Sequence, residues 1–223
     1  MNLALIIARK GSKRIVDKNL KKIKNKYIIQ IVLEKILNSK LFNKVIVSTD
    51  SLRIQKISNK IKKVETPFLR PKILSGDKVG TRDVVLHAIN FFKKKKYHIT
   101  NVCCFYPTSI FFTKTKLLEA FNKIDNKNYV ISCSTVNQNL NRSFKIKNGK
   151  NKFLFKGSYF KRTQDFDEVY VDAAQFYLGK VSTWKNQNKI INSSTKLVKF
   201  SRFSYVDIDN LDDLSFAKKL FKF

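Results

Sequence analysis

The fold is decided by the stretch Leu3-Ala-Leu-Ile-Ile-Ala-Arg-Lys-Gly-Ser-Lys-Arg-Ile-Val-Asp-Lys-Asn19. Its apolar run, from Leu3 to Ala8, stops abruptly at a basic segment that contains Gly11. A short, continuous apolar run of this kind is typical of a strand that is buried on both faces of a sheet. Ligands of open α/β sheets bind at the carboxyl ends of such strands. The stretch therefore predicts a ligand site in the loop that follows the first strand.

The chemistry of this loop favours a nucleotide phosphate. Gly11 allows the backbone to approach a ligand closely, and exposed N–H groups together with Arg9 and Lys18 suit polyphosphate oxygens. The loop has neither the G-x-x-x-x-G-K-[ST] pattern of a Walker loop nor the G-x-G-x-x-G pattern of a dinucleotide fold. An exposed basic turn is the plain alternative, because lysine occurs throughout the chain.

The rest of the chain alternates between strand-like and helical patterns, which is typical of a mainly parallel sheet covered by helices. Strands are predicted at 44–50, 99–106, 129–134, 174–178 and 196–200, and helices at 28–37, 51–60, 81–92, 116–124 and 211–221. Thr81 could cap the helix at 81–92, and Leu211 and Phe216 are expected to face inward from the last helix. The segment 66–80 is predicted to be a binding loop. Residues 136–165 are predicted to form hairpins outside the main sheet.

Composition limits the class of protein. The 223 residues suit a single α/β domain, 1–223, with 136–165 as a small excursion. A formal charge of +30 raises the alternative of a basic nucleic-acid-binding protein. Lysine is spread along the whole chain without a nucleic-acid-binding motif, so we interpret the charge mainly as compositional bias and expect no specific nucleic acid partner.

The same sequence has no apolar run long enough to span a bilayer, and we expect no signal peptide, because the run Leu3–Ala8 is too short for one. We therefore expect a cytoplasmic protein without a membrane partner. Its cysteines, Cys103, Cys104 and Cys133, form no metal-binding or disulfide pattern and are expected to be small buried core residues.

A second candidate site is the acidic segment Tyr205-Val-Asp-Ile-Asp209. On a strand, Asp207 and Asp209 would face the same side. Two such carboxylates can hold Mg²⁺, which prefers oxygen ligands and shares them with substrate phosphates. The alternative is capping of the helix that follows, although Asp212 and Asp213 could serve that purpose. We predict a Mg²⁺ cofactor at Asp207 and Asp209.

The pattern Ala8-Arg-x-Gly-Ser-Lys-x-x-x-x-Lys-Asn19 resembles the signature of cytidylyltransferases that activate nine-carbon, sialic-acid-type sugars with CTP. The resemblance runs in order to about Leu220 and includes Phe68-Leu-Arg-Pro71. It implies a Rossmann-like nucleotidyltransferase fold, a three-layer α/β sandwich with a mainly parallel sheet and a small β-rich dimerisation excursion. It assigns Arg9 and Lys18 a catalytic role on the triphosphate. The nucleotide-binding residues that it implies are Ala8, Arg9, Gly11, Ser12, Lys18, Asn19, Arg70 and Thr81.

On the sugar side, Val102-Cys-Cys-Phe-Tyr-Pro-Thr-Ser109 resembles the family strand whose end lies against the sugar. Tyr106 stands where the sialic and legionaminic acid enzymes usually have Gln, which is similar to the pseudaminic acid branch of the family. The resemblance further implies that Arg162 pairs with the sugar carboxylate and that Asp172 and Gln175 contact its acylamino and hydroxyl groups. It also implies a homodimer.

The resemblance implies a reaction between CTP and a nine-carbon acidic sugar. The anomeric hydroxyl would attack the α-phosphorus of CTP, releasing pyrophosphate and leaving the CMP-sugar for glycoconjugate biosynthesis. Pseudaminic acid is the expected sugar, and N-acetylneuraminic, legionaminic or 3-deoxy-octulosonic acid are the alternatives within the class.

Overall fold

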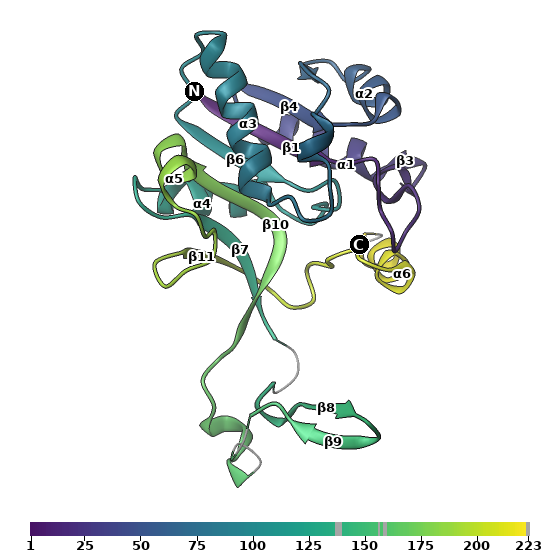
Figure 1. The fold of residues 1–223 in the computed structure, drawn as a ribbon, viewed down its shortest axis with the longest axis vertical. Helices are drawn as coiled ribbons and strands as arrows, with labels where there is room; N and C mark the ends of the chain where they lie inside the picture. The colour runs from purple at the N-terminus through teal and green to yellow at the C-terminus, as the bar shows by residue number, and fades with distance from the viewer. Residues whose placement is uncertain (137–139, 156, 158–159, 222–223) are drawn as a thin grey trace.

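A seven-stranded sheet forms the centre of the protein, whose computed structural model describes residues 1–136, 140–155, 157 and 160–221 (Figure 1). Its strands stand in the order β11-β7-β10-β6-β1-β4-β5. The neighbours are parallel except at β10, which runs antiparallel to β6 and to β7. Their bounds are Asn2–Ala8 (β1), Lys44–Thr49 (β4), Val64–Glu65 (β5), Asn101–Phe105 (β6), Val130–Thr135 (β7), Tyr170–Lys180 (β10) and Lys196–Phe200 (β11). The predicted mainly parallel α/β sheet is confirmed.

Helices cover both faces of this sheet and complete the predicted three layers. Their bounds are Ile28–Ser39 (α1), Leu52–Asn59 (α2), Thr81–Lys94 (α3), Lys114–Lys123 (α4), Val181–Asn186 (α5) and Leu211–Leu220 (α6). Buried residues of α1, α2, α4 and α6 belong to one core cluster, and those of α3 and α5 belong to another. The strand β1 separates the two clusters, because successive side chains of a strand point to opposite faces. Leu3 and Leu5 join one cluster, whereas Ala4 and Ile6 join the other.

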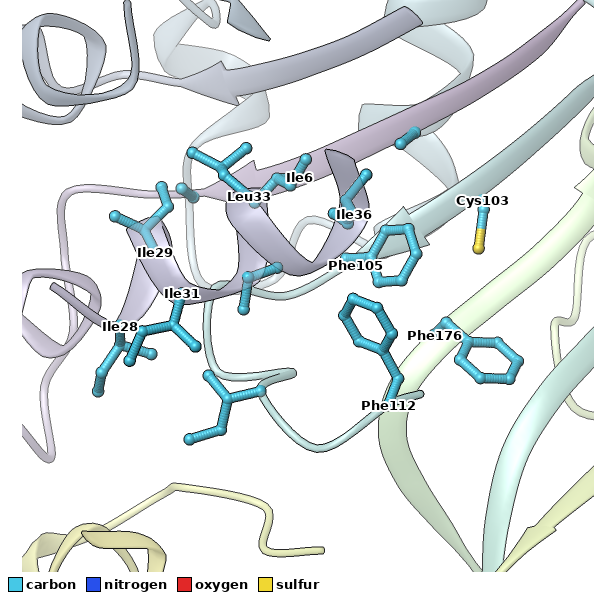
Figure 2. Close-up of a cluster of buried hydrophobic side chains, with 14 of the residues drawn as sticks. Ile6, Ile28, Ile29, Ile31, Leu33, Ile36, Cys103, Phe105, Phe112 and Phe176 are labelled. Carbon is cyan, nitrogen blue, oxygen red and sulfur yellow. The ribbon is translucent and has the colours of Figure 1, made fainter. Parts of the chain in front are cut away.

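The larger cluster fixes α1 against the sheet, as Figure 2 shows. Ile29, Leu33 and Ile36 lie along one side of the helix, at the spacing expected of an amphipathic helix, and all are buried. The rings of Phe105 and Phe112 pack together below them, with centroids 5.0 Å apart. This contact ties the end of β6 to the chain that follows it, which matters because the site lies at that end.

Most of the predicted strands and helices are present, but some side chains and caps differ from the expectation. Leu211 is 65% exposed and Phe216 is 53% exposed, so the expectation that both face inward from α6 is wrong, and Leu214 and Ala217 fill the core instead. Gly80, not Thr81, is the N-cap residue of α3. The short antiparallel pair of β2 (Lys22–Ile23) and β3 (Lys26–Tyr27), which lies before α1, was not predicted.

A hairpin lies outside the main sheet, as predicted. It pairs β8 (Phe144–Lys147) with β9 (Lys150–Phe153) in a separate two-stranded sheet. Figure 1 shows it well apart from the seven-stranded sheet, at the opposite end of the molecule from α3. Large apolar side chains are exposed on this excursion, among them Phe144, Ile146, Phe153, Leu154, Phe155 and Phe160.

The helices and the cysteines allow two further statements. Within the described ranges, no helix is both long and apolar enough to cross a membrane. Cys103, Cys104 and Cys133 are unpaired and buried, and the expectation that they are core residues is confirmed.

Candidate functional site

A cleft of about 650 Å³ opens where the loop after β1 meets the ends of β6 and β10 and the segment before α6. This is the carboxyl edge of β1 and β6, where the first stretch of sequence predicted a ligand site. The cleft brings together residues from distant parts of the chain. The predicted site residues that line it are Arg9, Gly11, Ser12, Lys18, Asn19, Arg70, Thr81, Tyr106, Asp172, Asp207 and Asp209.

The loop after β1 is held by hydrogen bonds that leave its cationic side chains in the cleft. The buried Asn19 donates from Nδ2 to the carbonyl oxygen of Arg9 at 2.9 Å, which joins the two ends of the loop. The backbone N–H of Lys10 donates to Oδ1 of Asp50 at 2.6 Å. A Cβ at Gly11 would meet no protein atom within 4 Å, so its backbone borders open space. The loop is therefore anchored at its ends and accessible at its centre.

Lys18 connects this loop to the acidic segment before α6. Its Nζ donates to the carbonyl oxygen of Ile208 at 2.7 Å and lies 3.3 Å from Oδ1 of Asp209. Arg14 reaches the same carboxylate at 2.8 Å. The phosphate-binding and metal-binding candidates of the sequence analysis are thus in direct contact, although they are 190 residues apart.

A carboxylate from the predicted binding loop pairs with two other cations of the loop after β1. Asp77 pairs through Oδ1 with Arg9 and through Oδ2 with Lys13, the latter at 2.6 Å. Hydrogen bonds from Lys13 and Arg9 lower the pKa of Asp77 below its ordinary value. Asp77 therefore occupies, in the free protein, cations that an anionic ligand would need.

Arg70 supplies a buried cation at the floor of the cleft. Arg70 is only 6% exposed, and its backbone N–H donates to the carbonyl oxygen of Thr49 at 2.8 Å. Its Nε and Nη2 are buried and have no hydrogen-bond partner within the described part of the chain. Asp50 lies 3.9 Å from Nη2, and burial is the main cause that lowers the pKa of Arg70. A guanidinium with unused donors that borders a cleft is prepared for an anionic or carbonyl-bearing ligand.

Asp207 and Asp209 reach the cleft without the strand on which they were expected. The segment 205–209 is irregular, so that expectation is wrong. Its residues nevertheless alternate, because Val206 and Ile208 are buried in the core and the two carboxylates face the cleft. The caps of α6 are made by Asn210 and Asp213, which accept each other's backbone N–H. Capping therefore does not explain either of the carboxylates that line the cleft.

The donor set at this place fits Mg²⁺ that is shared with a substrate. Asp207 makes no hydrogen bond or ion pair with any residue that the structure describes, and its carboxylate borders the cleft. Desolvation, and then the charge of Asp209, raise the pKa of Asp207 to about 6. In the described ranges no cluster of three or more His, Cys, Asp or Glu side chains could hold a metal. Two carboxylates suit Mg²⁺, which commonly takes one or two of them together with phosphate oxygens and water.

The sugar-side candidates form a hydrogen-bonded wall. Tyr106 OH lies 2.7 Å from Oγ1 of Thr81, the first residue of α3. The ring of Tyr106 meets the ring of Tyr177 edge-on, with centroids 5.5 Å apart, and Tyr177 OH donates to Oδ2 of Asp172 at 2.6 Å. Burial raises the pKa of Tyr106 to about 12 and also raises the pKa of Asp172. Thr81 was expected to contact the nucleotide, and here its hydroxyl also supports Tyr106.

Three predicted residues do not line the cleft. Ala8 is buried in the core and contributes only by placing Arg9. Gln175 is buried, and its side chain bonds Phe111 N and Ala173 O, so its amide is occupied by the fold. Arg162 lies on the excursion, where it pairs with Asp165 at 3.0 Å. Sequence patterns could not separate these residues from true lining residues, because burial and long-range placement are tertiary properties.

The cleft also contains residues that the sequence analysis did not assign. Asp77, Arg14 and Tyr177 line it, each in contact with a predicted residue. The one available signal was for Asp77, an acidic residue inside a loop that was already predicted to bind a ligand. Arg14 was not separable from the other basic residues of its loop. No local pattern singles out Tyr177, because regular alternation along β10 would place it and Asp172, five positions apart, on opposite faces.

Comparison with known proteins shows the family of this chain. Residues 3–213 match the family model described as Cytidylyltransferase. A pseudaminic acid cytidylyltransferase of Campylobacter jejuni is 32% identical over 224 residues, which cover 99% of this chain and 96% of that protein. A Helicobacter pylori protein named pseudaminic acid cytidylyltransferase and UDP-2,4-diacetamido-2,4,6-trideoxy-beta-L-altropyranose hydrolase is 35% identical over 211 residues, which cover 92% of this chain and 40% of that protein.

Solved structures show the same fold at low sequence identity. A CMP:2-keto-3-deoxy-manno-octonic acid synthetase complexed with CTP superposes with a TM-score of 0.70 at 13% identity, covering 99% of this chain and 98% of that one. A 4-diphosphocytidyl-2C-methyl-D-erythritol synthase gives a TM-score of 0.70 at 12% identity, with the same coverage of 99% and 98%. The expected nucleotidyltransferase fold is thus confirmed. Because the family model spans nearly the whole sequence and full-length relatives share about a third of its residues, this chain belongs to the cytidylyltransferase family.

Proposed function

We propose that this protein is a CTP-dependent cytidylyltransferase that converts a nonulosonic acid, pseudaminic acid, into its CMP-sugar with release of pyrophosphate. The observation that carries the proposal is the cleft itself, in which the cations of the loop after β1 face the two carboxylates before α6. The full-length relatives named pseudaminic acid cytidylyltransferase support the choice of sugar, as does Tyr106 on the cleft wall.

The chain's own residues account for the binding of a triphosphate. Arg9 and Lys18 would bind its oxygens, and Asn19 holds the loop that carries them. Ser12 belongs to the same loop and lines the cleft. The unused N–H donors of Arg70 suit the cytidine part of CTP. The anomeric hydroxyl of the sugar attacks the α-phosphorus as pyrophosphate leaves, a reaction that depends mainly on positioning and on stabilising negative charge.

Asp207 and Asp209 would hold Mg²⁺. When bound, the ion neutralises phosphate charge and assists departure of pyrophosphate. Asp207 forms no ion pair with any cation that the structure describes, whereas Asp209 is shared with Lys18 and Arg14. Ligand binding would therefore redistribute the partners of Asp209 more than those of Asp207.

For the sugar, Tyr106 and Asp172 form the wall that we assign to recognition. We further propose that the chain is one nucleotidyltransferase domain whose excursion, residues 136–165, contacts a second copy to form a homodimer. The apolar side chains exposed on the excursion support this, because an isolated hairpin is marginally stable in water. Arg162 is part of the excursion, so its predicted contact with the sugar carboxylate would require the cleft of the second copy.

We place the reaction in the cytoplasm, where CTP is made and where free cysteines such as Cys103 remain reduced. No membrane partner or specific nucleic acid partner is proposed. If the protein binds nucleic acid and added salt abolishes that binding completely, the binding reflects only the net charge of +30.

Pyrophosphate release tests the proposal. The protein is incubated with CTP, Mg²⁺ and one of four acids in parallel: pseudaminic, legionaminic, N-acetylneuraminic or 3-deoxy-octulosonic acid. Release with pseudaminic acid alone is expected. Release with another acid would retain the reaction and refute the sugar, and no release from protein that still binds CTP would refute both.

A matched pair of variants separates the site from general charge. Lys18→Ala should lose most turnover, because it removes a cation that lines the cleft. Lys26→Ala removes an exposed lysine paired with Glu34 at 2.6 Å outside the cleft and should leave turnover unchanged. Equal activity of the two variants would contradict the assignment of Lys18.

A further inference from the structure

Tyr177 contacts both sugar-side candidates of the cleft wall, Asp172 and Tyr106, and neither the sequence motifs nor the comparisons assign it a role. Its hydroxyl donates to Oδ2 of Asp172 at 2.6 Å, and its ring supports the ring of Tyr106 edge-on. Tyr106 in turn contacts Thr81 at the start of α3. Two side chains, Tyr106 and Tyr177, thus link three elements, α3, the end of β6 and β10, and Tyr177 is only 5% exposed.

A regular strand could not make this connection. Asp172 and Tyr177 are five positions apart in β10, so regular alternation would place them on opposite faces. The pairing with β7 shows how they reach the same face. Asp172 stands opposite Cys133 and Tyr177 stands opposite Ile131, so four residues of β10, 173–176, intervene where β7 has one, Ser132. Because residues 131 and 133 face one side of the sheet, their partners do so as well.

The irregularity is held in place by specific contacts. Ala174 has a φ of 51°, in the left-handed region that non-glycine residues rarely occupy. Its backbone N–H donates to Oδ1 of Asp172 at 2.8 Å, and its carbonyl oxygen accepts from the hydroxyl of Ser109 at 2.8 Å. Ser132 Oγ accepts the backbone N–H groups of Gln175 and Phe176, at 2.8 and 3.2 Å. Strain of this kind persists where surrounding contacts maintain it, and it is common at functional sites.

We propose that Tyr177 is a positioning residue for the acidic sugar, which fixes the carboxylate of Asp172 and the ring of Tyr106 in one relative arrangement and thereby sets which nonulosonic acid is accepted. This inference rests on the proposed function. Both oxygens of Asp172 already accept one hydrogen bond from the protein, so the directions of its remaining lone pairs are fixed. Those lone pairs suit the N–H of an acylamino group or a sugar hydroxyl, while the fixed ring of Tyr106 limits the shape that fits beside them.

The test is Tyr177→Phe, which keeps the ring and removes the hydroxyl. The control is Tyr129→Phe, because Tyr129 is a fully buried tyrosine of the same core cluster whose hydroxyl donates to Gln187 O at 3.1 Å away from the cleft. Pyrophosphate release is measured with pseudaminic, legionaminic and N-acetylneuraminic acids, and KM is obtained separately for sugar and CTP. We expect Tyr177→Phe to raise the KM for pseudaminic acid roughly tenfold, because a hydrogen bond to a charged group is lost. We also expect an unchanged KM for CTP and weaker discrimination among the acids.

A second pair of variants shows whether Tyr177 acts through Asp172. If it does, Asp172→Asn and the double variant Asp172→Asn/Tyr177→Phe should have the same sugar KM. If Tyr177→Phe alone does not bind CTP, the double variant is used in its place. The double variant avoids a charged Asp172 carboxylate that has lost the Tyr177 hydroxyl as its donor. The inference is overturned if Tyr177→Phe behaves like Tyr129→Phe, if the KM values for sugar and CTP rise together, or if the two changes are additive. Absence of turnover by the unmodified protein with every acid would instead overturn the proposed function, and this inference with it.

Discussion

Replacing Arg70 with methionine should stabilise the ligand-free protein and weaken its binding of CTP. The guanidinium is buried, and its Nε and Nη2 find no hydrogen-bond acceptor within the described part of the chain. Asp50 is 3.9 Å away, too far for a hydrogen bond, and it already accepts one from the backbone N–H of Lys10. In the absence of ligand, the buried charge of Arg70 is thus only partly compensated.

The size of the effect follows from these contacts. Each buried donor without an acceptor opposes folding by about 1–3 kcal/mol. Attraction to Asp50 offsets part of the cost of burying Nε and Nη2 without acceptors. Replacement of a buried ion pair by apolar side chains often stabilises a protein by about 1–4 kcal/mol. We expect Arg70→Met to gain about 1–3 kcal/mol and its Tm to rise by roughly 2–10 °C. CTP should bind at least about tenfold more weakly, since a charge-assisted interaction is lost.

Urea unfolding and calorimetric titration with CTP measure the two effects on the same variant. Arg53→Met is the control, because Arg53 is 61% exposed in its side chain and pairs with Asp17 at 3.2 Å outside the cleft. Its stability should stay within about 0.5 kcal/mol of the unmodified protein. A loss of stability in Arg70→Met relative to this control would refute the reasoning about uncompensated charge. Unchanged CTP affinity would refute the assignment of Arg70 to the ligand.

Three further predictions concern other charged groups. Burial lowers the pKa of Lys35 from 10.5 to about 8, because the charged form is the one that burial opposes. Lys35→Met should therefore stabilise the protein by about 1–3 kcal/mol near pH 7, where Lys35 is charged in the folded and the unfolded protein. This gain should disappear between pH 8 and 10.5, where folded Lys35 is neutral. The gain is reduced by the loss of the hydrogen bond from Lys35 Nζ to the carbonyl oxygen of Ile110, at 2.7 Å. Urea unfolding of both proteins across this pH range measures the gain in stability. A gain that does not change with pH would contradict the prediction. Asp77→Asn should tighten CTP binding by about two- to fivefold, because Arg9 and Lys13 lose their carboxylate partner and become free to bind the nucleotide. The control is Glu34→Gln, which opens a 2.6 Å ion pair outside the cleft and should leave CTP affinity unchanged. Equal CTP affinities of the two variants in calorimetric titration would refute competition by Asp77. Asp209→Asn should raise the Mg²⁺ concentration for half-maximal activity by roughly tenfold or more, because each 1.4 kcal/mol of lost ligand interaction is a factor of ten, and an unchanged Mg²⁺ titration would show that this carboxylate does not bind the metal.

Local patterns of sequence determined the layers of the fold. The apolar run at Leu3–Ala8 and the 3.6-residue period of α1 each state which side chains must be buried, and burial of those side chains produces the sheet and its covering helices. The same local information predicted a ligand site in the loop after β1, because Arg9, Gly11 and Lys18 lie close together in the sequence, and all three line the cleft. Asp207 and Asp209 were also correctly paired, although their segment is not a strand, since alternating burial alone places them on one side.

Contacts between distant segments decided the rest. Asp77 meets Arg9 across 68 positions and Lys18 meets Ile208 across 190, and no local period encodes such distances. Gln175 and Asp172 look alike as polar residues of one strand, yet the register with β7 buries the first and opens the second to the cleft. Sequence alone therefore determined which residue types the site contains. Only the tertiary structure decided which of them face each other, because pairing in space depends on strand register and on the irregularity at Ala174 that shifts it.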